Sequence, residues 1–108
     1  MVRLTIVAVM LLAAGCAPSQ PPPSEDHVRL AKACVAGGGD KAHCECEATK
    51  VDDLLASGSI DPEVAQALIL QAEGKEDEAD KIMLGVEYRK RFEQPSLVAE
   101  EKLKCVAG

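Results

Sequence analysis

The sequence predicts an all-α protein in which four or five short helices form a compact, disulfide-linked array. After residue 24, apolar residues recur at intervals of three and four, which is the spacing of one face of a helix. The sequence offers no strand-like alternation of useful length. Five cysteines with one Tyr, one Phe and no Trp indicate a small domain with a thin core, a size class that disulfides commonly stabilise.

The N-terminal segment predicts export, followed by a spacer. Arg3 supplies a short positive region, and the uncharged apolar run from Leu4 to Ala14 fits the hydrophobic region of a signal peptide. That run is shorter than the ~20 residues that a membrane-spanning helix requires. Residues 17–24, APSQPPPS, favour an extended spacer of about 25 Å, which we call the tether.

The stretch LLAAGC resembles the lipobox of bacterial lipoprotein precursors, with Ala13, Ala14 and Gly15 before Cys16. The resemblance implies that the signal is cut before Cys16 and that the Cys16 thiol carries diacylglycerol, with fatty acids such as palmitate. It also implies a lipid anchor in the cell envelope. If the cell is Gram-negative, the non-acidic Ala17 implies the outer membrane, with the domain facing the periplasm. The alternative is an ordinary secretory cut after Ala17, which would discard Cys16.

We therefore expect three parts: a signal peptide (residues 1–15), the lipidated cysteine with the tether (16–24) and a small helical domain (25–108). In the domain, Ser24 can cap a first helix, and the glycines at 37–39 should end it. Its apolar face is expected at Val28, Ala31, Cys34 and Val35.

The second helix is expected over residues 41–56, ending at Ser57–Gly58–Ser59. Its apolar face should comprise Cys44, Ala48, Val51 and Leu55.

Asp61 and Pro62 predict the start of a third helix, because proline suits the first helical position. Its segment Val64–Leu70 is apolar around much of its circumference, and we expect a partner groove or a self-association surface there.

A fourth helix is expected over residues 75–94, with acidic residues at its start and Arg89, Lys90 and Arg91 at its end, as the helix dipole favours. Pro95 should then break the chain, leaving a last helix from Leu97 to Val106.

The four cysteines after Cys16 form an even set, as expected for disulfides in an oxidising compartment. On a helix, Cys44 and Cys46 would point about 200° apart and so suit two different partners. Cys34 and Cys44 are symmetric about Gly39 and can meet across a hairpin. This favours pairing Cys34 with Cys44 and Cys46 with Cys105. Pairing Cys34 with Cys46 and Cys44 with Cys105 fits nearly as well, and four cysteines allow three pairings.

Composition argues against several functions. A net charge of −6 disfavours nucleic acid and anionic lipid headgroups as partners, and the near absence of aromatic residues removes platforms for bases or sugars. The only histidines, His27 and His43, have no nucleophile signalled beside them, so both are expected to be solvated surface side chains. We predict no catalytic residues, no metal site and no cofactor, and therefore no enzyme.

The alternative function is that of a metal-binding or thiol-redox protein. It would use the cluster of His43, Cys44 and Cys46, because thiolates and imidazole bind zinc or copper. The favoured prediction is a lipid-anchored, non-enzymatic envelope protein that binds an envelope protein or acts structurally. The flanking Glu45 and Glu47 make a poor setting for reactive thiolates, which use electropositive surroundings. The domain also resembles small cysteine-containing helical envelope proteins of bacteria with no assigned activity, which implies no mechanism.

Overall fold

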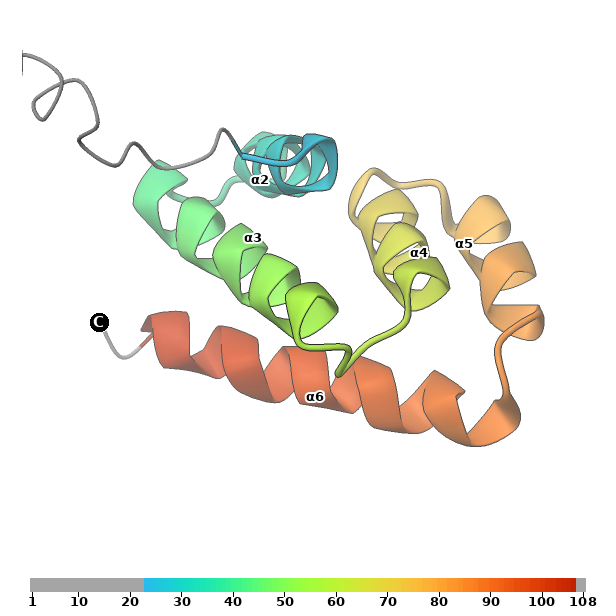
Figure 1. Ribbon diagram of the computed structural model, residues 1–108. Helices are drawn as coiled ribbons and strands as arrows, with labels where there is room; N and C mark the ends of the chain where they lie inside the picture. Colours follow the sequence, from blue (N-terminus) through green and yellow to red (C-terminus); the bar gives the residue numbers. More distant parts are fainter. Residues whose placement is uncertain (1–22, 107–108) are drawn as a thin grey trace, which may run out of the picture.

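The computed structural model describes residues 23–106 and folds them into helices joined by short turns (Figure 1). No strand occurs in this part of the chain, and the predicted all-α fold is confirmed. The signal peptide, Cys16 and nearly all of the tether lie outside the described residues. The helices are α2 (Glu25–Ala36), α3 (Lys41–Ala56), α4 (Pro62–Ala72), α5 (Glu76–Leu84) and α6 (Tyr88–Val106).

Helix α4 is central to the packing. It contacts each of the other four helices, whereas α2 and α3 form a hairpin and α6 runs along the outer edge of α3 and α4 (Figure 1). This position corrects the expectation for Val64–Leu70. Val64, Ala67 and Ile69 are buried inside the domain, so that face of α4 is not an exposed partner surface. The apolar residues around the circumference of α4 are explained by its neighbours, because other helices cover it on several sides.

Local capping explains the first helix boundaries, which match those expected from the sequence. The Ser24 hydroxyl accepts a hydrogen bond from the backbone N–H of His27 at 3.0 Å, and the Asp40 carboxylate accepts one from the N–H of His43 at 3.1 Å. Gly38 follows α2 with φ +100°, a left-handed conformation that glycine adopts without strain.

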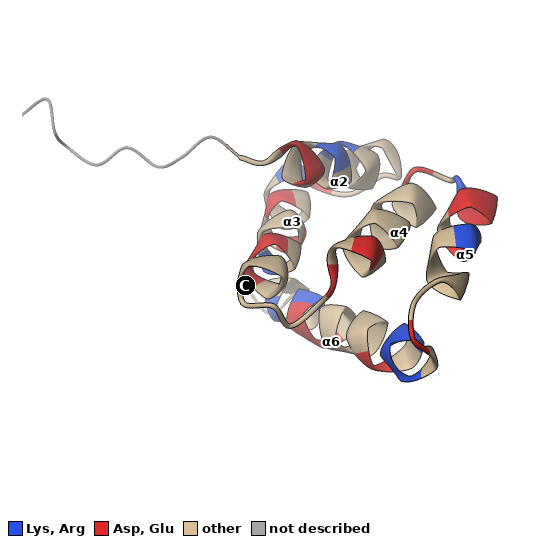
Figure 2. Cartoon of the chain, turned by 45° about the vertical axis from the view of Figure 1, so that its right-hand side comes forward, with Lys and Arg blue, Asp and Glu red and all other residues tan. Residues whose placement is uncertain are grey.

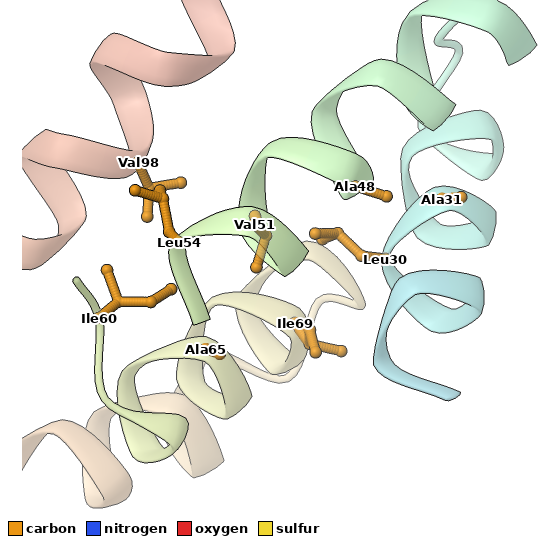
Figure 3. Close-up of a cluster of buried hydrophobic side chains, with 9 residues drawn as sticks. All are labelled: Leu30, Ala31, Ala48, Val51, Leu54, Ile60, Ala65, Ile69 and Val98. Atoms are coloured by element: carbon orange, nitrogen blue, oxygen red, sulfur yellow. The ribbon is translucent and has the colours of Figure 1, made fainter. Parts of the chain in front are cut away.

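The core lies between α2, α3, α4 and α6 (Figure 3). Figure 3 shows Leu30, Val51 and Ile69 projecting into the space between three helices, with Leu54 meeting Val98 where α6 crosses. Only aliphatic and alanine side chains form this cluster, as expected of a thin core. Its members are Leu30, Ala31, Ala48, Val51, Leu54, Ile60, Ala65, Ile69 and Val98.

The apolar face predicted for α2 is partly wrong. Val28 and Val35 are 49% and 45% exposed, whereas His27, Leu30 and Ala31 are buried. The buried face is rotated by about one residue because α2 packs against both α3 and α4 and places a histidine, not a valine, at the contact.

The helix predicted over residues 75–94 is also wrong, because α5 ends at Leu84 and α6 begins at Tyr88. The break falls at Gly85, which caps α5. The Arg91 guanidinium stabilises it by donating to the carbonyl of Leu84, the last residue of α5, at 2.8 Å and to that of Val86, in the turn, at 2.9 Å. The basic residues 89–91 therefore lie at the start of α6, not at a helix C-terminus. Arg91 still satisfies the negative helix end, but that end belongs to the preceding helix.

Pro95 does not end a helix, contrary to expectation, and lies inside α6. A proline in a helix interior costs about 3 kcal/mol, because it removes one backbone hydrogen bond and crowds the preceding turn. Packing on both sides offsets this cost. The buried Gln94 side chain accepts a hydrogen bond from the Asp61 N–H at 2.8 Å, and Val98 is 2% exposed.

Candidate functional site

Two disulfides join the helices, as the sequence predicted. They link Cys34 to Cys44 and Cys46 to Cys105, with Cα–Cα distances of 5.6 and 5.9 Å, and this is the pairing that the sequence favoured. The first closes the α2–α3 hairpin. The second joins α3 to the last turn of α6 across 59 residues of sequence. Helix α6, whose start is joined to α5, is therefore also fixed at its far end.

The hairpin disulfide packs directly against Gly39. A Cβ atom at that position would lie 2.5 Å from the Cys44 Sγ and 2.9 Å from the Cys34 Sγ, so no larger residue fits without movement. Cys44 is fully buried, whereas Cys34 is partly exposed. The turn glycine and the disulfide thus form one structural unit.

His43, Cys44 and Cys46 do not converge on one point. The two sulfurs bond to different partners, on α2 and on α6. The His43 Nε2 lies 2.8 Å from a carboxylate oxygen of Glu47, one turn along the same helix, with a third of its side chain exposed. Among residues 23–106, no three His, Cys, Asp or Glu side chains are grouped so as to hold a metal ion.

His27 is buried, which corrects the expectation of a solvated side chain. Its Nδ1 lies 2.8 Å from an oxygen of Asp52 and its Nε2 lies 2.6 Å from an oxygen of Glu45, both on α3. The Ser24 hydroxyl, which accepts from the His27 backbone, donates to the other Asp52 oxygen at 3.1 Å. The histidine therefore connects the start of α2 to two carboxylates of α3 that lie two helical turns apart.

The hydrogen bond to Glu45, together with the bond to Asp52 and the charge of both carboxylates, raises the pKa of His27 above its ordinary value, although burial opposes the shift. A protonated imidazole can donate to both carboxylates at once, and neither nitrogen is then free to accept a proton or bind a metal. The cluster is thus suited to holding helices together. The sequence contained a signal for the burial of His27, because His27 precedes Leu30 and Ala31 by three and four residues and so lies on the same face of the helix.

The exposed surface of α6 carries an apolar stripe that the sequence did not lead us to expect. Tyr88, Phe92, Leu103 and Val106 are between 60% and 69% exposed, and Ala99 is exposed beside them. At ~100° per residue, these positions fall within about 60° of one another around the helix. We call this surface, comprising Tyr88, Phe92, Ala99, Leu103 and Val106, the α6 stripe.

The α6 stripe holds both aromatic residues of the chain. The Tyr88 and Phe92 rings meet edge to face, with centroids 5.1 Å apart and planes at 67°. The Arg91 guanidinium lies 5.9 Å from the centre of the Tyr88 ring. These contacts order the aromatic end of the stripe even though it faces solvent.

Comparison of the chain with models of protein families, with curated proteins and with solved structures finds no match. Within residues 23–106, every helix is too short or too polar to cross a bilayer.

Proposed function

We propose that this protein is a lipid-anchored, non-enzymatic component of a bacterial cell envelope whose helical domain binds another protein. The observation that carries the proposal is the α6 stripe. Large apolar side chains left exposed along a helix commonly mark a surface that another protein covers. The disulfides support a structural role for the cysteines, because the Cys46–Cys105 disulfide fixes the end of the helix that carries the stripe.

The anchor is supported by the order of features along the chain. The lipobox-like LLAAGC is followed directly by the proline-rich tether, and the first helix begins at Glu25, just after it. A tether of about 25 Å would hold a folded domain clear of the membrane surface. Two disulfides fit an oxidising compartment such as the periplasm. In the proposal, Cys16 attaches the protein to the envelope membrane, at the outer membrane if the cell is Gram-negative.

The same geometry disfavours the alternative, a metal-binding or thiol-redox protein. That function would need His43, Cys44 and Cys46 to act together, but the two sulfurs have different disulfide partners. Both histidines face carboxylates at hydrogen-bonding distance.

Intact mass of the protein extracted from envelopes without reductant tests the proposal. We expect a diacylglycerol-modified chain that begins at Cys16 and is lighter by about four hydrogens, as two disulfides require. A Cys16→Ala variant should leave the membrane fraction, whereas the matched Ser19→Ala variant should remain in it. A full set of free thiols, or added mass equal to a metal ion, would replace this proposal with the alternative.

A further inference from the structure

We propose that His27 and Glu45 form a pH-sensitive switch at the start of the helical domain. When the imidazole becomes neutral, Glu45 leaves it for Lys41, whereas Asp52 keeps its contact with the histidine. The inference goes beyond the proposed function and depends neither on the lipid anchor nor on the α6 stripe, because it rests on side chains of α2 and α3 alone.

The His27 imidazole lies between two carboxylates that it can satisfy only as a cation. The residue is 8% exposed, and its Nε2 lies 2.6 Å from an oxygen of Glu45 and its Nδ1 2.8 Å from an oxygen of Asp52. Both contacts are hydrogen bonds when both nitrogens carry a proton. A neutral imidazole has a single N–H group, so one of the two carboxylates then faces a nitrogen lone pair and is repelled.

Glu45 is the carboxylate that can move away. Its side chain is 50% exposed, against 32% for Asp52, and it is longer by one methylene group. Asp52 is also held by the Ser24 hydroxyl, which donates to its other oxygen at 3.1 Å. Neutral His27 therefore keeps its proton on Nδ1, facing Asp52, and its Nε2 releases Glu45.

Lys41 is the new partner of Glu45. The two residues are four apart on α3, a spacing at which oppositely charged side chains meet on the surface of a helix. Both are exposed, and both line one pocket together with Pro23, His27 and Val28. Movement of Glu45 toward Lys41 therefore replaces one ion pair by another and uncovers the Nε2 side of the imidazole.

The other charged groups near His27 are paired with different residues or lie on the wall of that pocket. Helix α4, which also packs against α2, directs Glu73 to Arg29 at 2.6 Å and Gln66 to Asp26 at 3.2 Å. Lys32 of α2 lines the pocket. Figure 2 shows acidic residues recurring along α3 and basic residues on the adjacent α2. Within residues 23–106, the side-chain hydrogen bonds of the imidazole are those to the two α3 carboxylates.

The direction of the switch follows from these contacts. The hydrogen bond to Glu45 is the largest cause of the raised pKa of His27, burial opposes it, and the hydrogen bond to Asp52 adds to it. The imidazolium therefore predominates at the ordinary histidine pKa of about 6.5, and Glu45 leaves as the pH rises through the higher pKa. Because Ser24 caps α2 directly after the tether, the switch loosens the first turn of the domain at alkaline pH.

Nitrogen NMR of the imidazole ring tests the switch in the full-length protein, purified from membranes in detergent. Above the titration midpoint, neutral His27 should carry its proton on Nδ1, and contacts between the Glu45 and Lys41 side chains should appear in nuclear Overhauser spectra. Asp52→Asn should move the proton to Nε2, because Glu45 is then the stronger acceptor. Glu45→Gln should leave the proton on Nδ1 and lower the midpoint. The control His43→Gln, which removes the other histidine, should change neither the tautomer nor the midpoint.

Hydrogen exchange distinguishes a local switch from general destabilisation. The Val28 amide donates to the Ser24 carbonyl at 3.0 Å, and its protection factor should fall about tenfold between pH 6 and pH 9, as the loss of a hydrogen bond to a charged group implies. The Gly39 amide, which donates to the Cys34 carbonyl at 3.0 Å, should lose less protection, because the disulfide holds that end of α2. In the matched variant His27→Gln, which cannot become cationic, protection at Val28 should not vary with pH.

The results that would overturn the inference are distinct for each measurement. In the NMR spectra they are a proton on Nε2 of neutral wild-type His27, an unchanged tautomer in Asp52→Asn, or no contact between the two α3 side chains above the midpoint. In hydrogen exchange they are equal losses of protection at Val28 and Gly39, or pH-dependent protection in His27→Gln. Neither measurement reports on lipidation or on α6, so failure of the switch is distinguishable from failure of the proposed function.

Discussion

Removal of the Cys46–Cys105 disulfide should destabilise the domain more than any single exposed contact. This disulfide joins α3 to the last turn of α6, and the two cysteines are 59 residues apart in sequence. The double change Cys46→Ala with Cys105→Ala removes the covalent link without leaving an unpaired thiol. Both side chains are partly exposed, so little cavity is created.

The loop length gives the magnitude. In the chain-entropy model, a link across 59 residues lowers the free energy of folding by about 4 kcal/mol, and the Cys34–Cys44 link across 10 residues by about 3 kcal/mol. A domain of this size has a total stability of roughly 5–10 kcal/mol. Loss of the longer link should therefore remove a large part of the stability. We expect α6 to separate from α3 first.

Urea unfolding followed by far-UV circular dichroism measures the effect. The protein can be prepared as a soluble form beginning at Ser24, which we expect to fold alone because α2 is capped there. Hydrogen exchange should accelerate in the last turns of α6 and remain slow at the α2–α3 turn. A loss of unfolding free energy below about 1 kcal/mol would refute the argument that closing this loop stabilises the domain.

Three further changes test separate parts of the structure. Gly39→Ala should cost about 2 kcal/mol in urea unfolding, because the new Cβ would overlap the Cys34–Cys44 disulfide, whereas Gly37→Ala, with no atom nearer than 3.5 Å, should cost less. His27→Ala should cost about 1–3 kcal/mol at pH 6. Because the pKa of His27 is raised in the folded state, its stabilisation is fully present below the unfolded pKa of about 6.5 and is lost as pH rises through the folded pKa. The difference between wild type and His27→Ala should therefore shrink by pH 9, and a constant difference would contradict this. Arg91→Ala should lower the free energy of unfolding by about 1 kcal/mol and speed hydrogen exchange at the end of α5, because two carbonyls lose their donor. The control Arg89→Ala, which removes an exposed side chain, should change neither the free energy of unfolding nor the exchange rate.

Local chemistry alone determined much of this protein. The N-cap of Ser24, the glycines at 37–39 and the Asp61–Pro62 pair each set a helix boundary, because capping and backbone conformation depend on residues that are neighbours in sequence. The all-α class and the presence of disulfides followed from periodicity and from the even number of cysteines. The favoured pairing also had a local cause, since Cys34 and Cys44 are opposite each other across a short turn.

Only the tertiary structure decided which faces are covered. Val64, Ala67 and Ile69 are buried because α4 contacts four helices. His27 is buried where α3 supplies two carboxylates that are far from it in sequence. Pro95 remains helical because burial of its neighbours offsets its cost. Helix α5 ends where Arg91 of the next helix binds the carbonyl of Leu84 and that of Val86 in the following turn. The α6 stripe is recognisable only once the opposite face is known to be buried, because sequence periodicity reveals an apolar face but not what covers it.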